Sequence, residues 1–236
     1  MSFSPLVVWH DIECGGYAAD LPLWHELAAR EPGPVLDVGA GTGRVARSLA
    51  AAGHDVTALD REPELLRTLA ARPGGERVTT VVADAADFSL GRAFGLILVP
   101  MQTIQLLPAR PGFFAAARAH LAPGGLLALA IAAALEDFGE LAERPAPDTG
   151  AVGAWRFASQ PTAVRAVTAA TRIERVRTTV APDGGVTEED DVIELATVTA
   201  DGLEAEGRAA GLTPEPARVI PETADHVGAE VVLLRG

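Results

Sequence analysis

A short apolar strand that opens directly into a glycine-rich turn constrains the fold of this chain more than any other feature. Residues 35–38 read Val-Leu-Asp-Val, and Gly39, Gly41 and Gly43 follow at alternate positions before a helical stretch that ends near Gly53. A strand, turn and helix of this type bring bare backbone N–H groups and a helix N-terminus close to a ligand. Three closely spaced glycines cost backbone entropy that a plain turn would not need. We therefore expect a ligand site at this turn.

An acidic residue, Asp37, lies inside the same strand, two positions before the first glycine. A buried carboxylate is costly unless a partner compensates its charge, and a cationic ligand group above the turn would do so. The G-x-G-x-G spacing differs from the G-x-G-x-x-G of dinucleotide binders. This difference argues against a nicotinamide oxidoreductase, which would also place a ribose on Asp60 at the end of the next strand.

Strands and helices alternate along most of the chain, which predicts a parallel, doubly wound α/β sheet. A helix beginning at Asp20 and Pro22 precedes the alternation, whereas residues 1–18 show no clear pattern and are expected to be irregular. The expected strands are 34–38, 55–60, 77–83, 94–99 and 125–132, and the expected helices are 43–53, 62–71 and 111–121.

The pattern changes from Glu143 onward. Residues 144–150 are expected to form a loop, and Val-, Thr- and Arg-rich strands around a Pro-Asp-Gly-Gly turn predict an antiparallel ribbon. A helix capped by Thr199 and a strand hairpin then close the chain. The expected ribbon strands are 153–169, 171–181 and 186–198, and the closing strands are 216–220 and 230–234. The expected domains are a lid segment (1–30), a core (31–142), an insertion (143–198) and a closing segment (199–236).

A series of ordered elements resembles the class I S-adenosylmethionine-dependent methyltransferases. They are the turn at 39–43, acids ending two strands at Asp60 and Asp84, the strand at 94–100, and the turn at 121–127. The resemblance implies a seven-stranded Rossmann-like sheet with an antiparallel last strand and a ribbon inserted after strand five, where relatives cover the substrate. It also implies S-adenosylmethionine as cofactor and S-adenosylhomocysteine as product.

The resemblance assigns roles to residues near the strand ends. The glycine loop faces the methionine part of the cofactor, Asp60 holds the ribose hydroxyls, and Asp84 with the Ala85 N–H contacts the adenine. Arg61 either stacks on the adenine edge or is simply solvated. The implied cofactor-binding residues are Tyr17, Asp37, Gly39, Ala40, Gly41, Gly43, Asp60, Arg61, Asp84, Ala85, Val99 and Met101.

The residues that would act on the acceptor are less defined. Gln102 and Gln105 follow strand four and are neutral, so they can orient a substrate but cannot deprotonate it. His10 and His226 are the candidate bases, and they matter for an alcohol acceptor more than for an amine. Because no base stands out, we expect transfer dominated by positioning. Val-Pro-Met-Gln at 99–102 replaces the Asn/Asp-Pro-Pro-Tyr-type motif of relatives that act on amino groups of nucleic acid or protein.

The N-terminal segment has two interpretations. Trp9, His10 and Tyr17 either close over cofactor and substrate as a lid or pack onto the core. If they form a lid, deleting residues 1–18 should impair turnover more than folding.

Composition excludes several classes of function. A net charge of −13 argues against nucleic acid as a partner. The single cysteine, Cys14, cannot form an internal disulfide, and no Cys/His cluster has metal-ligand spacing. The N-terminus lacks the charged start of a signal peptide, and the longest apolar run, 126–135, is too short to span a membrane. We expect a cytoplasmic protein without metal or membrane partner, either a monomer or a homodimer.

The sequence therefore predicts methyl transfer to a small-molecule acceptor, with N-methylation slightly favoured over O-methylation. Two alternatives use the same cofactor site: a cyclase or other non-methylating enzyme, and a non-catalytic cofactor-binding module. Fold alone does not separate these activities.

Overall fold

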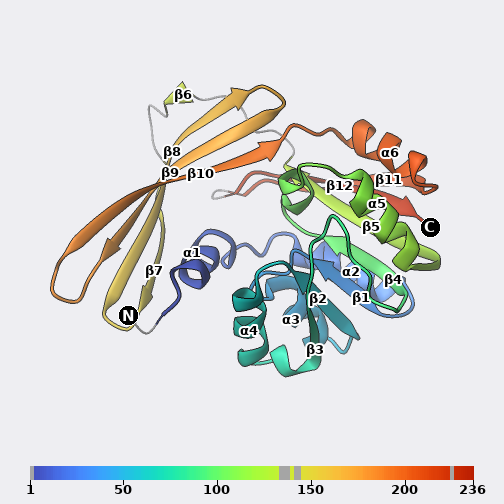
Figure 1. Cartoon of the computed structure of the whole chain (residues 1–236), viewed down its shortest axis with the longest axis horizontal. Coiled ribbons are helices and arrows are strands. Elements are labelled where there is room, and N and C mark those ends of the chain that lie inside the picture. The colour runs from blue at the N-terminus through green and yellow to red at the C-terminus, as the bar shows by residue number, and fades with distance from the viewer. Residues whose placement is uncertain (1–2, 133–138, 141–144, 224–225) are drawn as a thin grey trace. The chain divides into compact units, whose positions relative to one another are not determined.

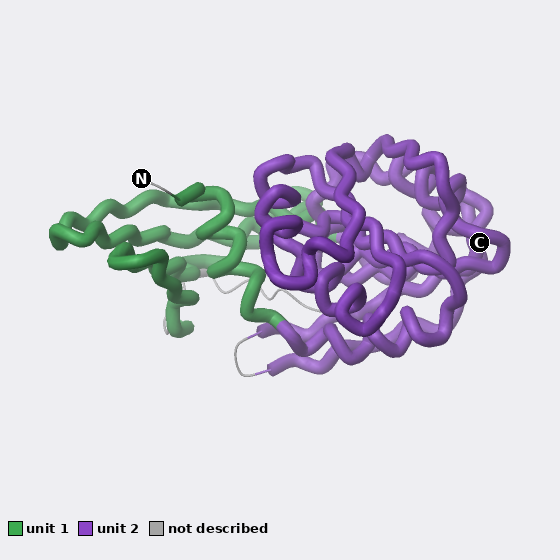
Figure 2. The backbone as a smooth tube through the Cα atoms, turned by 90° about the horizontal axis from the view of Figure 1, so that it is seen from below, with its two compact units in different colours: residues 1–17, 135–197 green, residues 18–134, 198–236 purple. Residues whose placement is uncertain are grey.

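The computed structural model describes residues 3–132, 139–140, 145–223 and 226–236. It divides into two compact units, shown together in Figure 1 and by colour in Figure 2. Unit 1 comprises residues 1–17 and 135–197, and unit 2 comprises residues 18–134 and 198–236. Each unit has its own sheet and its own buried apolar cluster.

Unit 2 is built on a mixed sheet that, over the described residues, has seven strands in the order β11-β12-β5-β4-β1-β2-β3. Strands β1 to β5 run parallel, whereas β12 lies antiparallel between β5 and β11. This confirms the predicted doubly wound methyltransferase-like sheet with its antiparallel closing strand. The strands are β1 (Val35–Val38), β2 (Val56–Asp60), β3 (Val78–Val82), β4 (Phe94–Val99), β5 (Leu121–Ala132), β11 (Thr213–Ile220) and β12 (Ala229–Arg235).

Helices cover both faces of this sheet. Leu36 and Val38 of β1 pack in one cluster with Phe113 of α5 and Leu203 of α6. Because side chains alternate along a strand, Val35 and Asp37 point to the opposite face. The helices are α2 (Leu21–Arg30), α3 (Arg44–Ala51), α4 (Pro63–Ala71), α5 (Pro111–His120) and α6 (Ala200–Ala209), with short 3₁₀ turns η1 (Gly75–Arg77) and η2 (Thr103–Leu106).

The first helix of unit 2 begins where the sequence predicted. Pro22 lies in its first turn, where the missing N–H costs little. Trp24 and Leu27 are fully buried on one side of α2. The indole N–H of Trp24 donates to the carboxylate of Asp20 at 2.8 Å, which fixes the start of the helix to the residue before it.

Unit 1 is an antiparallel sheet with one helix against it. The sheet order is β10-β9-β8-β6, and β7 pairs with β8 off this path. This confirms the predicted ribbon after strand five. The elements are α1 (Pro5–Cys14), β6 (Gly139–Glu140), β7 (Asp148–Val152), β8 (Trp155–Val167), β9 (Ala170–Val180) and β10 (Val186–Ala196). In the described part of the chain, no helix of either unit is both long and apolar enough to cross a membrane.

Two expectations for this unit are wrong. Residues 148–150, expected in a loop, begin β7 because they pair with β8 through Asp148 opposite Ser159. Residues 5–14, expected to be irregular, form α1, in which the Ser4 side chain caps the helix and Pro5 occupies its first turn. The expected domain boundary between residues 142 and 143 lies outside the described residues.

Aromatic packing holds α1 on the sheet of unit 1. Val8 and Trp9 are buried, and the Trp9 ring meets the Phe157 ring of β8 edge-on, with 5.5 Å between centroids. Phe3 makes a similar contact with Phe157 at 5.3 Å. Such pairs stabilise beyond the apolar area they bury.

A cluster of charges lies beside this aromatic contact. Glu13 of α1 accepts hydrogen bonds from Arg177 at 2.7 and 2.8 Å and pairs with Arg175 at 2.9 Å. Both arginines also pair with Asp191 of β10, at 2.7 and 3.1 Å. Burial alone would raise the pKa of Glu13, but Arg177, Arg175 and the Ser159 hydroxyl outweigh it, so the pKa is lowered.

Candidate functional site

The predicted cofactor residues of unit 2 follow the carboxyl ends of its parallel strands. The loop at 39–43 follows β1 and the segment from Pro100 to Gln102 follows β4. These strands are neighbours in the sheet, with Asp37 opposite Leu98, although β2 and β3 intervene in the sequence. Ligands bind α/β sheets at such a switch point, where connections leave in opposite directions.

The two loops at this switch point touch each other. A Cβ atom added to Gly39 would lie 2.5 Å from Cγ2 of Thr103, the first residue of η2. A Cβ atom added to Gly43 would collide with the side chain of Leu69 on α4. Packing inside the protein therefore already requires glycine at these two positions. The third glycine, Gly41, has φ +55°, the left-handed region that glycine adopts at no steric cost.

The expectation of bare N–H groups in the loop is wrong at four positions. The end of β2 lies beside the loop, so the fold itself accepts these donors. Gly39 and Ala40 both donate to Leu59 O, at 2.8 and 3.0 Å, Gly43 donates to Ala40 O at 2.9 Å, and Gly41 donates to Asp60 Oδ2 at 2.8 Å. The loop thus offers a ligand close backbone approach at these positions rather than free donors.

Asp37 is the most unusual group of the site. Its side chain is only 1% exposed, and neither carboxyl oxygen has a hydrogen-bond partner among the described residues. Its neighbours across the sheet, Ala58 of β2 and Leu98 of β4, are fully buried and apolar. This burial raises the pKa of Asp37 to about 7, although the charge of Arg44 and the backbone N–H of Ala46 act in the opposite direction.

A buried ion pair lies next to Asp37 and was not identified from the sequence. Arg44, the first residue of α3, donates two hydrogen bonds to Asp20, one of them at 2.7 Å. Asp20 is 1% exposed and also accepts from Trp24. Because Asp20 balances the charge of Arg44, ionised Asp37 and Asp60 would leave the site with excess negative charge, which suits a cationic ligand.

Asp60 lies half-buried at the end of β2, as expected for a residue that holds a ribose. Its Oδ2 accepts from Gly41 N, and its Oδ1 accepts from Glu62 N at 2.9 Å. Each carboxylate oxygen has a second lone pair, so these bonds leave acceptor capacity for ligand hydroxyls. Its neighbour Arg61 is mostly exposed and lies 3.5 Å from the Glu62 carboxylate.

Asp84 and Ala85 follow β3 in a turn. Asp84 is exposed, and its Oδ1 accepts from Ala86 N at 2.8 Å, so it caps its own turn. Ala85 is half-buried and packs against the main apolar cluster of unit 2. The adenine contacts assigned to both residues stay a prediction.

The end of β4 has a strained backbone. Val99 is fully buried, and Met101 has φ +54°, in the left-handed region that residues with a side chain rarely adopt. Such strain costs roughly 1–3 kcal/mol and is concentrated at functional sites. Gln102 is half-buried and immediately precedes η2.

Gln105 has a hydrogen bond within the fold. It is 6% exposed, and its Oε1 accepts from Ala132 N, at the end of β5, at 2.9 Å. This bond ties η2 to the sheet. The role of Gln105 in orienting a substrate stays a prediction.

His226 lies in the connection between β11 and β12. Since Ala229, the first residue of β12, pairs with Ala132, this connection is at the carboxyl edge of the parallel strands. The His226 N–H donates to Thr223 Oγ1 at 3.0 Å. Residues 224 and 225 of the same turn lie outside the described residues.

The N-terminal candidates belong to unit 1. His10 Nδ1 lies 4.0 Å from Asp11 Oδ1, and Tyr17 is buried. Trp9 has the packing role, because it lies under the Arg177 guanidinium, 5.3 Å from the ring centroid, within the core of the unit. Deleting residues 1–18 would disturb this core, so the deletion does not separate a lid from packing. The lid role of His10 and Tyr17 stays a prediction.

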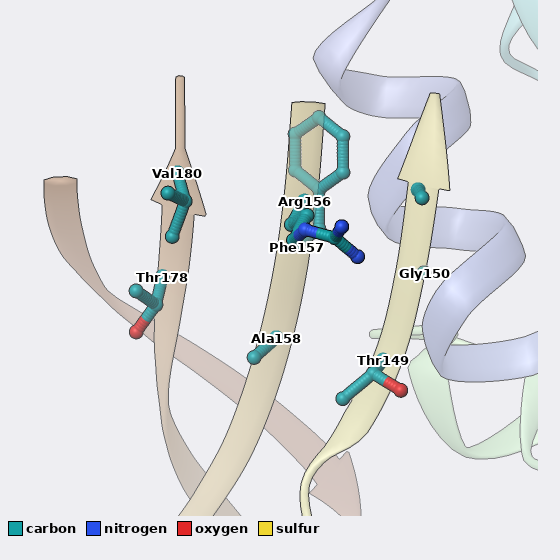
Figure 3. Close-up of a pocket in the computed structure, with 8 residues that line it drawn as sticks. Thr149, Gly150, Arg156, Phe157, Ala158, Thr178 and Val180 are labelled. Atoms are coloured by element: carbon teal, nitrogen blue, oxygen red, sulfur yellow. The ribbon is translucent and has the colours of Figure 1, made fainter. Parts of the chain in front are cut away.

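A groove of about 500 Å³ on the sheet of unit 1 was not anticipated from the sequence (Figure 3). Residues of β7, β8 and β9 line it, with Arg156 opposite Val180 and Ala158 opposite Thr178. No periodic signal in these strands distinguishes the groove from an ordinary sheet surface. Over the described residues, no group of His, Cys, Asp and Glu side chains is arranged to hold a metal ion.

Comparison with known proteins identifies a methyltransferase domain in this chain. Residues 35–125 match the model of a methyltransferase domain. This segment runs from β1 to the start of β5 and contains the loop at 39–43, Asp60, Asp84 and the strained turn after β4.

Several solved structures share the fold. KedS8, a sugar N-methyltransferase from a Streptoalloteichus species, has 21% identity and a TM-score of 0.74 over 100% of this chain and 95% of its own. DesVI from Streptomyces venezuelae has 22% identity and a TM-score of 0.73 over 95% and 94%. CalS10 from Micromonospora echinaspora, an amino pentose methyltransferase solved with S-adenosylmethionine bound, has 20% identity and a TM-score of 0.71 over 100% and 99%.

The domain match covers the switch point and its loops, while the structural similarity extends over both units. The order and direction of the strands in unit 2 agree with what the sequence pattern predicted for this fold. The chain therefore contains a methyltransferase domain at residues 35–125 and shares its fold with KedS8 and CalS10, both of which are methyltransferases.

Proposed function

We propose that this protein transfers a methyl group from S-adenosylmethionine to an amine of a small, sugar-like acceptor. The observation that carries the proposal is Asp37, a buried carboxyl group whose oxygens accept no well-formed hydrogen bond in the described structure, at a switch point where ionised Asp37 and Asp60 would need a cationic partner. That environment fits the cationic methionine end of the cofactor. The names of KedS8 and CalS10 support a sugar acceptor, and that of KedS8 supports nitrogen as the accepting atom.

Each end of the cofactor has candidate partners. Asp37 and the loop at 39–43 would hold the methionine end, with the backbone of Val99 and Met101 beside it. Asp60 would accept hydrogen bonds from the ribose hydroxyls. The adenine end would lie near Asp84, Ala85 and Arg61, and Tyr17 is the further candidate from unit 1. When bound, S-adenosylmethionine supplies a methyl group already activated by the positive sulfur.

The chain's own groups would act mainly by positioning. An unprotonated amine needs only to be held in line with the methyl group at about 3–3.5 Å, with water excluded. The strained Met101 and the anchored η2 fix the backbone at this edge, and Gln102 can orient the acceptor through its amide. His226, at the same edge, is the candidate to accept the amine proton after transfer, with His10 as the candidate from unit 1.

Methyl transfer can be tested with isotopically labelled S-adenosylmethionine and a panel of paired sugars. Each pair should differ only in carrying an amino group or a hydroxyl group at the same carbon. We expect label in the amino sugars and not in their hydroxyl partners. Label only in hydroxyl sugars would overturn N-methylation, and cofactor binding without transfer to any acceptor would favour the cyclase or binding-module alternatives.

A glycine substitution tests whether a ligand approaches the loop. Gly41→Ala is expected to reduce affinity for S-adenosylmethionine by about tenfold or more, because a side chain would enter the space next to the ligand. Gly91→Ala is a matched control, since Gly91 has φ +65° and open space around its Cα, and it precedes the amino end of β4. Calorimetry on both variants measures the effect, and equal affinities would show that the loop does not face a ligand.

A further inference from the structure

We propose that Asp37 is protonated in the ligand-free protein and releases its proton when the cationic cofactor binds. The inference rests on the proposed function, which names that cofactor. In this step the O–H bond of the carboxyl group breaks, and the proton passes to the buffer. The electron pair stays on the carboxylate, which then faces the positive charge of the ligand, so nothing is oxidised or reduced.

The isolation of the carboxyl group is the first argument. Asp37 is 1% exposed, and the residues beside it on the neighbouring strands, Ala58 and Leu98, are both fully buried. Neither of its oxygens accepts a well-formed hydrogen bond within the described structure, and the nearby backbone N–H of Ala46 favours the ionised form less than burial opposes it. An ionised carboxylate in such a place is far more costly than a neutral carboxyl group, so the empty site favours the protonated form.

The surrounding charges are the second argument. Asp20 lies before α2, Arg44 lies at the start of α3, and Asp60 lies at the end of β2. The charge of each influences the pKa of Asp37. The positive charge of Arg44 is engaged by two hydrogen bonds to Asp20, so it compensates a second carboxylate poorly. Asp20 and Asp60 both oppose ionisation of Asp37.

The other arginines of α2 and α3 are engaged elsewhere: Arg30 lies 3.6 Å from Glu26, and Arg47 donates to Pro73 O at 3.0 Å. Strand β4 reads Phe-Gly-Leu-Ile-Leu-Val and carries no titratable group. On α2, the ring of His25 is hydrogen-bonded to the Ser48 hydroxyl of α3 at 2.8 Å. Because Arg44 is already paired with Asp20, a further positive charge for Asp37 would come from a ligand, and its arrival would ionise the group.

This coupling predicts a specific pH dependence of binding. Below the raised pKa of about 7, the proton must leave before the carboxylate can pair with the ligand. Affinity should therefore rise by up to about tenfold per pH unit as the pH approaches 7, and then level off. The amino group of the ligand stays mostly protonated over this range, because the pKa of an α-amino group is about 7.7–8.0.

Calorimetry of the full chain with S-adenosylmethionine tests the inference. The titration is done at pH 6 in phosphate and in imidazole, whose heats of ionisation differ, and repeated from pH 5.5 to 7.5 in one buffer. We expect the difference in binding heat between the two buffers to correspond to the release of about one proton per bound cofactor at pH 6. The number of protons released should fall as the pH rises. Asp37→Asn should abolish this release, and Asp87→Asn, a change at an exposed carboxyl, should retain it.

The outcomes separate the two proposals. Cofactor binding with the same heat in both buffers and a flat pH profile would overturn proton release while leaving the cofactor site intact. Absence of binding at every pH would overturn the proposed function and the inference together. The wild-type protein alone decides between these results, so the test does not depend on the folding of any variant.

Discussion

Asp37→Asn is expected to stabilise the ligand-free protein at neutral pH and, at the same time, to weaken cofactor binding. In the folded state the pKa of Asp37 is raised from 3.8 to about 7, so the folded protein keeps a proton that the unfolded chain releases. The stability that this proton provides is present below about pH 4 and is lost as the pH rises to 7. One pH unit corresponds to about 1.4 kcal/mol, so the loss reaches up to about 4 kcal/mol.

Asparagine does not titrate and avoids this loss. Urea denaturation of both proteins between pH 4 and 8 measures the difference in the free energy of unfolding, and the advantage of Asp37→Asn should grow up to about pH 7 and then level off. Asp87→Asn serves as the control, since its exposed side chain is solvated in both states and its curve should follow the wild type. A difference between Asp37→Asn and wild type that stays constant with pH would contradict the burial of an ionisable Asp37.

A variant that is more stable but binds the cofactor more weakly identifies a ligand-binding residue. Replacing a residue with only a packing role would not produce both effects. Proteins keep unfavourable groups at sites where a ligand later compensates them. If Asp37→Asn instead weakened the fold and left cofactor affinity unchanged, the carboxyl group would have a packing role and the proposed site would lose its main support.

Glu13→Ala is expected to cause the largest loss of stability in unit 1. The variant leaves Arg175 and Arg177 partly buried, with Asp191 as their remaining shared ion-pair partner among the described residues. Breaking a buried pair on one side typically costs about 3 kcal/mol or more. Because the pKa of Glu13 is lowered, its contribution is complete at neutral pH and is lost as the pH falls through that lowered value.

Hydrogen exchange of the full chain measures this effect where it should occur. Amides of β8, β9 and β10 are expected to exchange faster in Glu13→Ala, whereas those of unit 2 should not change. Glu26→Ala removes an exposed two-bond pair with Arg218 and provides the matched control, for which we expect little change, as is usual for surface pairs. Equal protection of β8 to β10 in wild type and Glu13→Ala would mean that the cluster does not stabilise the unit.

The fold of unit 2 was predictable because the local sequence patterns favour the same helices and strands that the tertiary packing requires. Apolar runs such as Phe94–Val99 have the length of buried strands, and Pro22 and Pro63 lie in first helical turns that the sequence marks. The hairpin turn at 182–185 likewise indicated an antiparallel ribbon. These features depend on neighbours in sequence, so composition and spacing are enough to read them.

The errors involve contacts between residues far apart in sequence. Helix α1 has few internal signals and is held by Phe157 and by the arginines of β9, more than 140 positions away. The pair between Asp20 and Arg44 and the bond from Ala132 to Gln105 are also invisible before the strands are arranged. A polar residue at a loop can bind substrate or hold the loop, and only its partner decides which.

The loop glycines illustrate the same limit. Their spacing predicted a ligand, yet Gly39 and Gly43 are already required by Thr103 and Leu69. Asp37 is the stronger signal, because it combines an acidic residue in an apolar strand with a position one residue before the strand ends. Its unsatisfied burial, which the sequence could only suggest, is what the structure adds.

The most direct test of the central claim is calorimetric binding of S-adenosylmethionine and S-adenosylhomocysteine to the full chain at pH 7.5, with NAD as the comparison. We expect both adenosyl compounds to bind with micromolar affinity and NAD to give no heat. Binding of NAD in their place, or binding of none of the three, would contradict the cofactor site described at Asp37 and the loop at 39–43.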